Sequence, residues 1–88
     1  MTPTRTRSLR DIDPETARGL IANCISEEHI DEKWVHSTAI QMKKGRFDTY
    51  GACLEIDSRG NLTQGLPYLM AIVESGVIVR IWVAKSNS

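Results

Sequence analysis

The sequence predicts an α+β domain in which one or two N-terminal helices pack on a four-stranded antiparallel meander sheet. Three observations lead to this class. Apolar residues recur at helical spacing near the N-terminus, three short turns that end in glycine lie at an even interval, and β-compatible residues flank each of those turns. The length of 88 residues is enough for one domain and not for two.

The composition is that of an ordinary globular protein. Hydrophobic residues make up 41% and charged residues 25%, which argues against disorder. The 11 basic and 11 acidic residues cancel, so no overall field draws the chain onto nucleic acid or an anionic membrane. No apolar run approaches the roughly 18 residues of a membrane span, and no secretion signal is recognisable. We therefore expect a cytoplasmic protein without membrane contact.

The first ten residues, MTPTRTRSLR, show no periodicity and offer little to bury. We predict a flexible arm over residues 1–10 and a single small globular domain over residues 11–88. Because Arg5, Arg7 and Arg10 lie in this arm, it is either a solvated tail or a basic segment that reaches a phosphate backbone or an acidic partner.

The first predicted helix begins after Asp13, a favourable N-cap, with Pro14 at its first position and Glu15 in its first turn. Apolar residues then follow the 3.6-residue period, at Ala17, Leu20, Ile21, Cys24 and Ile25. A short second helix could start at Ser26-Glu27-Glu28 and run towards Trp34.

Three similar triplets predict the meander: Lys43-Lys44-Gly45, Ser58-Arg59-Gly60 and Glu74-Ser75-Gly76. A turn that ends in a residue at positive φ requires glycine in that last place. The predicted strands are residues 36–42, 46–56, 61–73 and 77–84, although residues 36–42 fit a helix equally well. The stretch from Asp57 to Asn61 is then a hairpin turn between two of these strands.

The last two predicted strands, YLMAIVE and VIVRIWVA, are apolar on both faces, whereas a sheet with one wet face alternates. The second face needs a cover, which a second helix, closure into a barrel or another protein chain could supply. Contiguous exposed apolar surface usually marks an interaction site. The fourth strand could also lie at a sheet edge and pair with another chain. The candidate partner-binding residues are Trp82, Arg80, Ile78 and Tyr68, whereas Trp34 suits the core equally well.

Few residues suggest chemistry. Cys24 and Cys53 are expected to be free, buried thiols, with a single disulfide between them as the alternative. His29 and His36 would share one side of a continuous helix with Glu32 between them, but no recognised metal motif is completed. No phosphate-binding glycine loop or nucleophile motif occurs. We therefore expect no metal, no cofactor and no catalytic residue.

Two stretches resemble known families. The segment AIQMKKGRFDTYGACLEIDSRGN resembles the first conserved segment of Sm-like RNA-binding proteins, with Gly51, Asp57 and Asn61 at similar intervals. This resemblance covers about a quarter of the chain and implies a ring whose Asp57 and Asn61 contact RNA bases.

The C-terminal stretch YLMAIVESGVIVRIWVAKS is similar to the terminal hairpin of toxin ribonucleases of the RelE/ParE kind. That resemblance implies that Arg46, Arg59, Arg80 and Lys85 hold phosphate and that His36 shuttles a proton.

The function that we predict is a small non-enzymatic interaction or regulatory protein, whose compactness suggests a bacterial or phage source. It docks a partner protein, or a second copy of itself as a homodimer, through an apolar sheet face or edge. The alternative is nucleic-acid binding, either by an Sm-like module or by a RelE/ParE-like ribonuclease. The candidate nucleic-acid contacts are Arg5, Arg7, Arg10 and Arg59.

Overall fold

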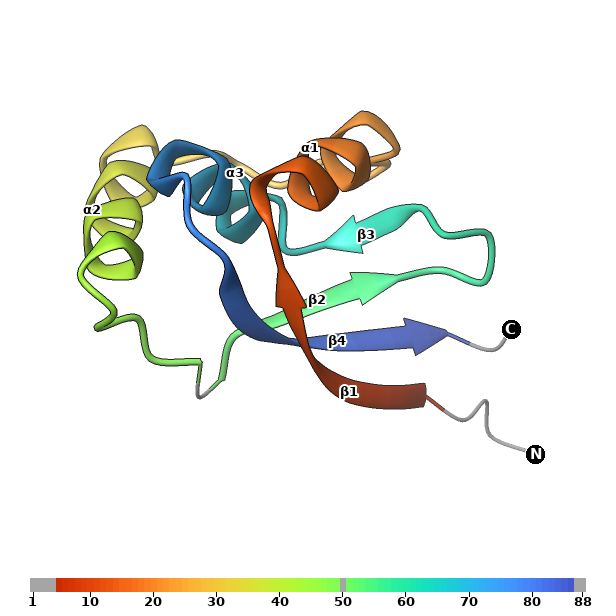
Figure 1. Ribbon diagram of the computed structural model, residues 1–88. Helices are drawn as coiled ribbons and strands as arrows, with labels where there is room; N and C mark the ends of the chain where they lie inside the picture. The colour runs from red at the N-terminus through yellow and green to blue at the C-terminus, as the bar shows by residue number, and fades with distance from the viewer. Residues whose placement is uncertain (1–4, 50, 87–88) are drawn as a thin grey trace.

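A computed structural model of the protein describes residues 5–49 and 51–86 (Figure 1). The elements, in chain order, are β1 (Arg5–Ile12), α1 (Pro14–Ala22), α2 (Glu32–Lys43), β2 (Cys53–Ile56), β3 (Leu62–Gln64), α3 (Leu66–Ser75) and β4 (Val79–Ser86). The predicted α+β class is confirmed.

The sheet is mixed, with strand order β1-β4-β2-β3. β1 and β3 each lie antiparallel to their neighbours, whereas β2 and β4 are parallel. A parallel pair needs a crossover connection, and α3 supplies it between β3 and β4. The predicted all-antiparallel meander is therefore wrong. The expectation that the last strand lies at a sheet edge is also wrong, because β4 runs between β1 and β2.

Helix α1 forms where the sequence predicts it. The Thr16 N–H donates to Asp13 Oδ1 at 2.6 Å, and Pro14 occupies the first turn. Ala17 is fully buried, and Leu20 and Ile21 pack against the core from the same side. The helix ends at Ala22, so the predicted stripe extends one turn too far.

Helix α2 replaces the first predicted strand, residues 36–42. Asp31 Oδ1 accepts from the N–H groups of Lys33 and Trp34, at 3.0 and 3.2 Å, and so caps the helix. The buried residues Val35, Ala39 and Met42 follow a spacing of four and three, which is a helical stripe. The second helix thus begins later than the predicted Ser26 start and runs on to Lys43.

Helix α3 replaces most of the third predicted strand, residues 61–73, of which only Leu62–Gln64 is strand. Pro67 fits the first helical turn, and Gly76 at φ +71° ends the helix. A short, continuously apolar run looks alike in a strand and in a helix; here Leu69 and Ile72 are completely buried, whereas Met70 and Val73 are half-buried. Likewise, only Cys53–Ile56 of predicted strand 46–56 pairs in the sheet.

The predicted flexible arm is also wrong from Arg5 onwards, because these residues form β1 and pair with β4 along its whole length. Backbone hydrogen bonding to β4 holds this mostly polar strand in place, and Ile12 at its end is buried in the core. Residues 1–4 of the predicted arm lie outside the described part of the chain.

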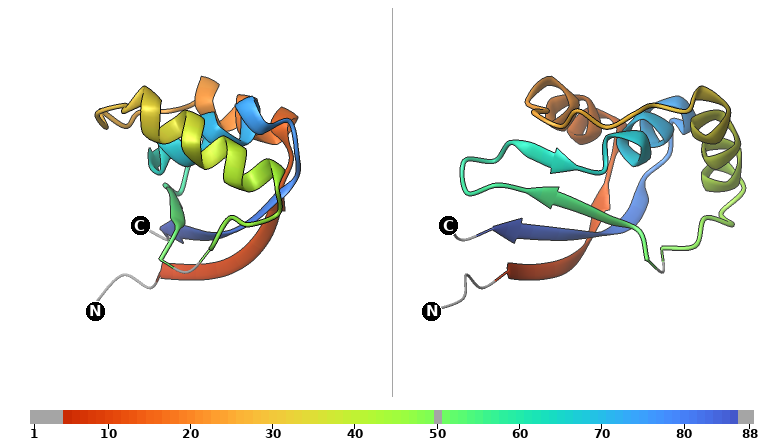
Figure 2. Two further views of the ribbon diagram at one scale, coloured as in Figure 1. Left: turned by 90° about the vertical axis from the view of Figure 1, so that its left-hand side faces the viewer. Right: turned by 180° about the vertical axis from the view of Figure 1, so that it is seen from behind.

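The core lies between the helices and one face of the sheet. Its largest completely buried side chains are Leu54, Leu62, Leu69, Ile72 and Ile81. In Figures 1 and 2 the three helices gather together, while β1 and β4 run on past them towards the two termini. α1 and α2 both contact α3, which is the central helix of the layer.

A close contact between the backbone of Gly65 and Leu54 of β2 fixes the start of α3. Gly65 has φ +106°, and a Cβ atom at this position would lie 2.6 Å from Leu54 Cδ2 and 3.1 Å from Leu54 Cα. Glu28 reaches the same point from the loop before α2. Its carboxylate accepts from the Gly65 N–H at 2.9 Å and from the Leu66 N–H at 2.8 Å. These bonds satisfy N–H groups that the helix itself leaves unpaired.

Gly65→Ala is expected to lower the free energy of unfolding by about 3 kcal/mol or more, because it adds both backbone strain and a clash with β2. The matched control is Gly45→Ala, at φ +69° with open space around it. The control should lose only about 1 kcal/mol, the strain of a left-handed alanine. Urea unfolding of both variants measures the difference. Equal losses of stability would show that the contact between Gly65 and Leu54 adds no constraint on the residue at position 65.

Candidate functional site

The two faces of β4 differ sharply in exposure. Val79, Ile81 and Val83 point to the helices and are buried. Arg80 and Trp82 alternate with them and point to the other face. We call this second side the outer face, and define it by the residues Arg7, Leu9, Asp11, Cys53, Glu55, Arg80, Trp82 and the buried Ala84. Ile78, just before β4, continues the alternation by its spacing.

A row of three side chains crosses the middle of the outer face. Trp82 on β4 is the register partner of Leu9 on β1 and of Cys53 on β2. Leu9 is 42% exposed and Trp82 is 37% exposed, although both are large and apolar. Contiguous exposed apolar groups of this kind are uncommon on a monomer unless they have a role.

Charged residues flank this row on both sides. Arg80 Nε donates to Asp11 Oδ1 at 2.9 Å, and this hydrogen bond, with the charge of Asp11, raises the pKa of Arg80 above its usual range. On the other side of the row, Arg7 is the register partner of Ala84. A depression of about 390 Å³ opens there, lined by Arg7, Cys53, Glu55, Gln64 and Ala84.

The structure brings three of the four predicted partner-binding residues together. Trp82, Arg80 and Ile78 share the outer face, and Ile78 is 66% exposed. Tyr68 does not join them, because it lies on α3 with its ring 5.2 Å from that of Trp34 and 6.1 Å from that of Phe47. Tyr68 lies elsewhere because the chain there is helix α3 and not the predicted strand.

Leu9 and Cys53 belong to the row but were not predicted. Leu9 is a single apolar residue among polar ones, so no periodic pattern marks its segment as a strand. Cys24 and Cys53 are both free, as predicted, and both are half-buried rather than fully buried. Only the pairing of Cys53 with Trp82 places it on this face.

The predicted nucleic-acid contacts do not form one patch. Arg7 lies on the outer face, whereas Arg10 alternates to the other side and helps line a cavity of about 340 Å³ with Lys85 and Gly60. Arg59 lies in the turn beside that cavity. Arg5 begins β1, but its side chain lies outside the described part of the structure.

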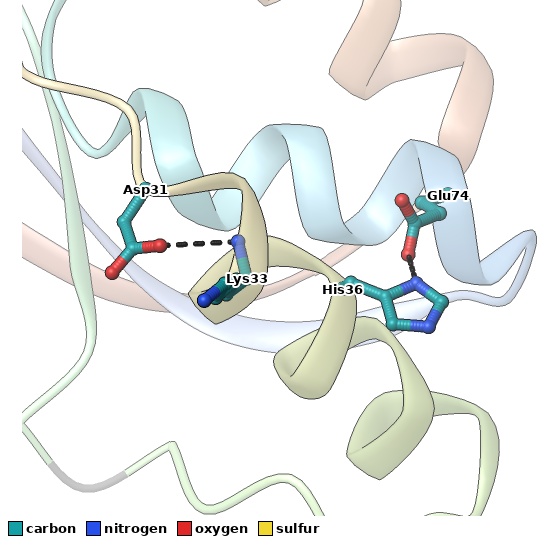
Figure 3. A network of polar contacts seen from close by, with 4 residues as sticks. All are labelled: Asp31, Lys33, His36 and Glu74. Carbon is teal, nitrogen blue, oxygen red and sulfur yellow. Dashed lines mark hydrogen bonds and ion pairs between the residues drawn. The ribbon is translucent and has the colours of Figure 1, made fainter.

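The residues implied by the ribonuclease resemblance are equally dispersed. Arg46, Arg80 and Lys85 line three different depressions. His36 lies on α2 with its Nδ1 2.9 Å from Glu74 Oε2 on α3, as Figure 3 shows. His29 precedes α2 and is not on one helix with His36. In the described part of the chain, no three histidine, cysteine or carboxylate side chains gather as metal ligands.

The turn from Asp57 to Asn61 joins β2 to β3, so the predicted hairpin is confirmed. Asp57 Oδ1 accepts from the N–H groups of Arg59 at 2.9 Å and Asn61 at 2.8 Å. The hydrogen bond from the Asn61 N–H is the main cause that holds the pKa of Asp57 below its usual range. Asp57 therefore serves the turn itself. The other two glycine triplets end α2 and α3 instead of joining strands.

No known protein family, curated protein or solved structure matches this chain. Across the part of the chain that the structure describes, no helix has the length and apolar character needed to cross a membrane. The function must therefore be argued from the outer face and the other surfaces of this chain alone.

Asp57→Asn keeps an acceptor oxygen in the turn but removes the charge. Because folding lowers the pKa of Asp57, its contribution to stability is present above the unfolded pKa of about 3.9 and disappears as the pH falls through the folded pKa. The variant should be less stable than the parent at pH 7 and equal to it near pH 2. Urea unfolding across this range is the measurement, with Ser58→Ala as a control whose effect should not vary with pH. A deficit that persists unchanged to pH 2 would contradict the assignment.

Proposed function

We propose that this protein is a non-enzymatic interaction protein that docks a second copy of itself through the outer face. The observation that carries the proposal is the row of exposed Leu9, exposed Trp82 and half-buried Cys53 across the middle of a sheet whose helices lie on the other side. Burial of such a row against an identical row removes apolar surface from water on both copies.

The charges on β1 favour a second copy over an unrelated partner. Arg7 and Asp11 lie two residues on either side of Leu9 and point to the same face. A two-fold axis that lies along the row of Leu9, Trp82 and Cys53 exchanges these two positions. Arg7 of each copy then faces Asp11 of its partner, and each row residue faces its own counterpart, as an isologous interface requires.

The size of the outer face sets the expected strength. β1 and β4 are about 27 Å long and β2 is about 13 Å long, so three strands about 4.8 Å apart present roughly 300 Å² per copy. Stable complexes bury about 800 Å² per partner, so this dimer belongs with weak and reversible associations. A weak association responds to changes in protein concentration, which suits a regulatory role.

The first test is sedimentation equilibrium of the full chain. We expect a monomer–dimer equilibrium with a Kd on the order of 100 µM, and an approximately 30-fold weaker association for Trp82→Ala, the value of about 2 kcal/mol typical of a central anchor. Ile40→Ala is the matched control, because Ile40 is also an exposed apolar residue but lies on α2. Its Kd should equal that of the parent. A parent protein that stays monomeric up to about 1 mM, ten times the expected Kd, would overturn the proposal.

Chemical cross-linking tests the orientation. The proposed axis places Cys53 opposite Cys53 of the partner copy. A short bismaleimide should therefore cross-link the Cys24→Ser variant, which keeps Cys53, into covalent dimers. It should leave the Cys53→Ser variant monomeric. Both cysteines are half-buried in the single chain, which makes the pair a fair comparison. Dimers that link through Cys24 would place the interface elsewhere.

The same preparations separate docking from the competing nucleic-acid function. An interface centred on apolar side chains loses little affinity with salt, whereas neutralising several phosphates gives a steep loss. Tight, salt-sensitive binding of an RNA or DNA oligonucleotide, combined with a monomeric protein, would favour the alternative through Arg5, Arg7, Arg10 and Arg59.

A further inference from the structure

A cavity of about 400 Å³ lies where the amino ends of α2 and α3 meet, away from the outer face. It takes side chains from the loop before α2, from α2 itself and from the start of α3. Two of its walls are aromatic and two carry carboxylates. The residues used below are Glu28, Asp31, Trp34, Gly65 and Tyr68.

The sum of charges around this cavity is negative. The amino end of each helix contributes roughly half a positive charge, and α2 and α3 both begin here. Glu28 and Asp31 contribute two negative charges, so about one negative charge remains when His29, which also lines the cavity, is neutral. Of the described residues that line the cavity, none is a lysine or an arginine.

An anion would need N–H donors at the two helix starts, but the carboxylates of Glu28 and Asp31 already occupy several of them. Glu28 already accepts from the N–H groups of Gly65 and Leu66, and Asp31 accepts from those of Lys33 and Trp34. Figure 3 shows Asp31 at the start of α2, where it accepts from the Lys33 N–H. Both hydrogen bonds to Asp31 use its Oδ1, so its Oδ2 accepts no hydrogen bond within the described part of the chain. That oxygen is available to a donor from outside.

The aromatic wall suits a cation as well. Trp34 and Tyr68 meet edge to face at 80°, an arrangement in which one ring presents its edge and keeps its own π-faces free of the other ring. Trp34 is 39% exposed. Organic cations bind over the faces of such rings, tryptophan most strongly, and a neighbouring carboxylate adds to the attraction.

We infer that this cavity binds an organic cation, an alkylammonium or guanidinium group, between the aromatic rings of Trp34 and Tyr68 and the carboxylates of Asp31 and Glu28. The group comes either from a small amine or from a lysine or arginine side chain of another protein. The inference does not depend on the docking face, which lies on the sheet.

The test uses the full chain and two probes that each carry one positive charge, butylamine and a Gly/Ser pentapeptide with a single lysine, an acetylated amino end and an amidated carboxyl end. The readout is the indole N–H signal of Trp34 in a ¹⁵N–¹H spectrum at pH 8, assigned by comparison with Trp82→Phe. We expect saturable shifts with a Kd on the order of 1 mM for butylamine. The uncharged analogue butanol should produce none.

Asp31→Asn is the informative variant, because asparagine caps a helix as well as aspartate and only the charge is lost. It should weaken butylamine binding about threefold to fivefold, the effect of one exposed ion pair. Trp34→Phe has no indole signal, so its binding is followed by the backbone amide signals of Gly65 and Leu66 at the cavity. It should weaken binding by a similar factor, and Trp82→Phe should not change it. Unchanged amide spectra elsewhere confirm that the variants fold.

The relative affinities of the two probes distinguish a small amine from a protein side chain as the source of the cation. A peptide that binds more than about tenfold tighter than butylamine identifies the lysine side chain of a protein as the ligand, since the added affinity must come from the peptide chain. Equal affinities identify a small amine. The absence of a saturable shift with both probes, an equal response to butanol, or an affinity unaffected by Asp31→Asn would each overturn the inference.

Discussion

The arrangement of the whole domain depends on the contact between Gly65 and Leu54. The backbone of Gly65 approaches β2 so closely that a methyl group there would overlap Leu54. This approach sets where α3 starts, and Glu28 holds the same point by bonding to the first N–H groups of the helix. Because α3 leads directly into β4, its starting point also sets the parallel pairing of β4 with β2. The core, the outer face and the cation cavity all follow from this placement.

Local signals predicted α1, the Asp57 turn and the approximate residue range of β4, because each depends on residues close together in the sequence. α2 and α3 were missed for different reasons. The stripe of Val35, Ala39 and Met42 was present in the sequence, but the even spacing of the glycine triplets favoured strands. The run before Glu74 is apolar at every position from Tyr68 to Val73, so neither period stands out. β1 could not be predicted, because only its pairing with β4 makes those polar residues a strand.

The candidate site was predicted in part. Trp82, Arg80 and Ile78 were found because the alternation along a strand is a property of that strand alone. Leu9 and Cys53 were not, since neighbours in a sheet depend on the strand order, which puts the first and last strands side by side. The cation cavity was missed for the same reason. Glu28, Trp34 and Tyr68 come from segments that only the fold brings together.

The central position of β4 bears on how the chain reaches its native state. β4 is the last of these seven elements to leave the ribosome, yet both β1 and β2 pair with it. Until it emerges, β1 has no strand to join, and only the β2–β3 hairpin can form. Contacts between segments so distant in sequence slow folding, because the intervening chain must be ordered first. The domain therefore completes its sheet in one late step, when synthesis of the strand is finished, and not progressively from its N-terminus.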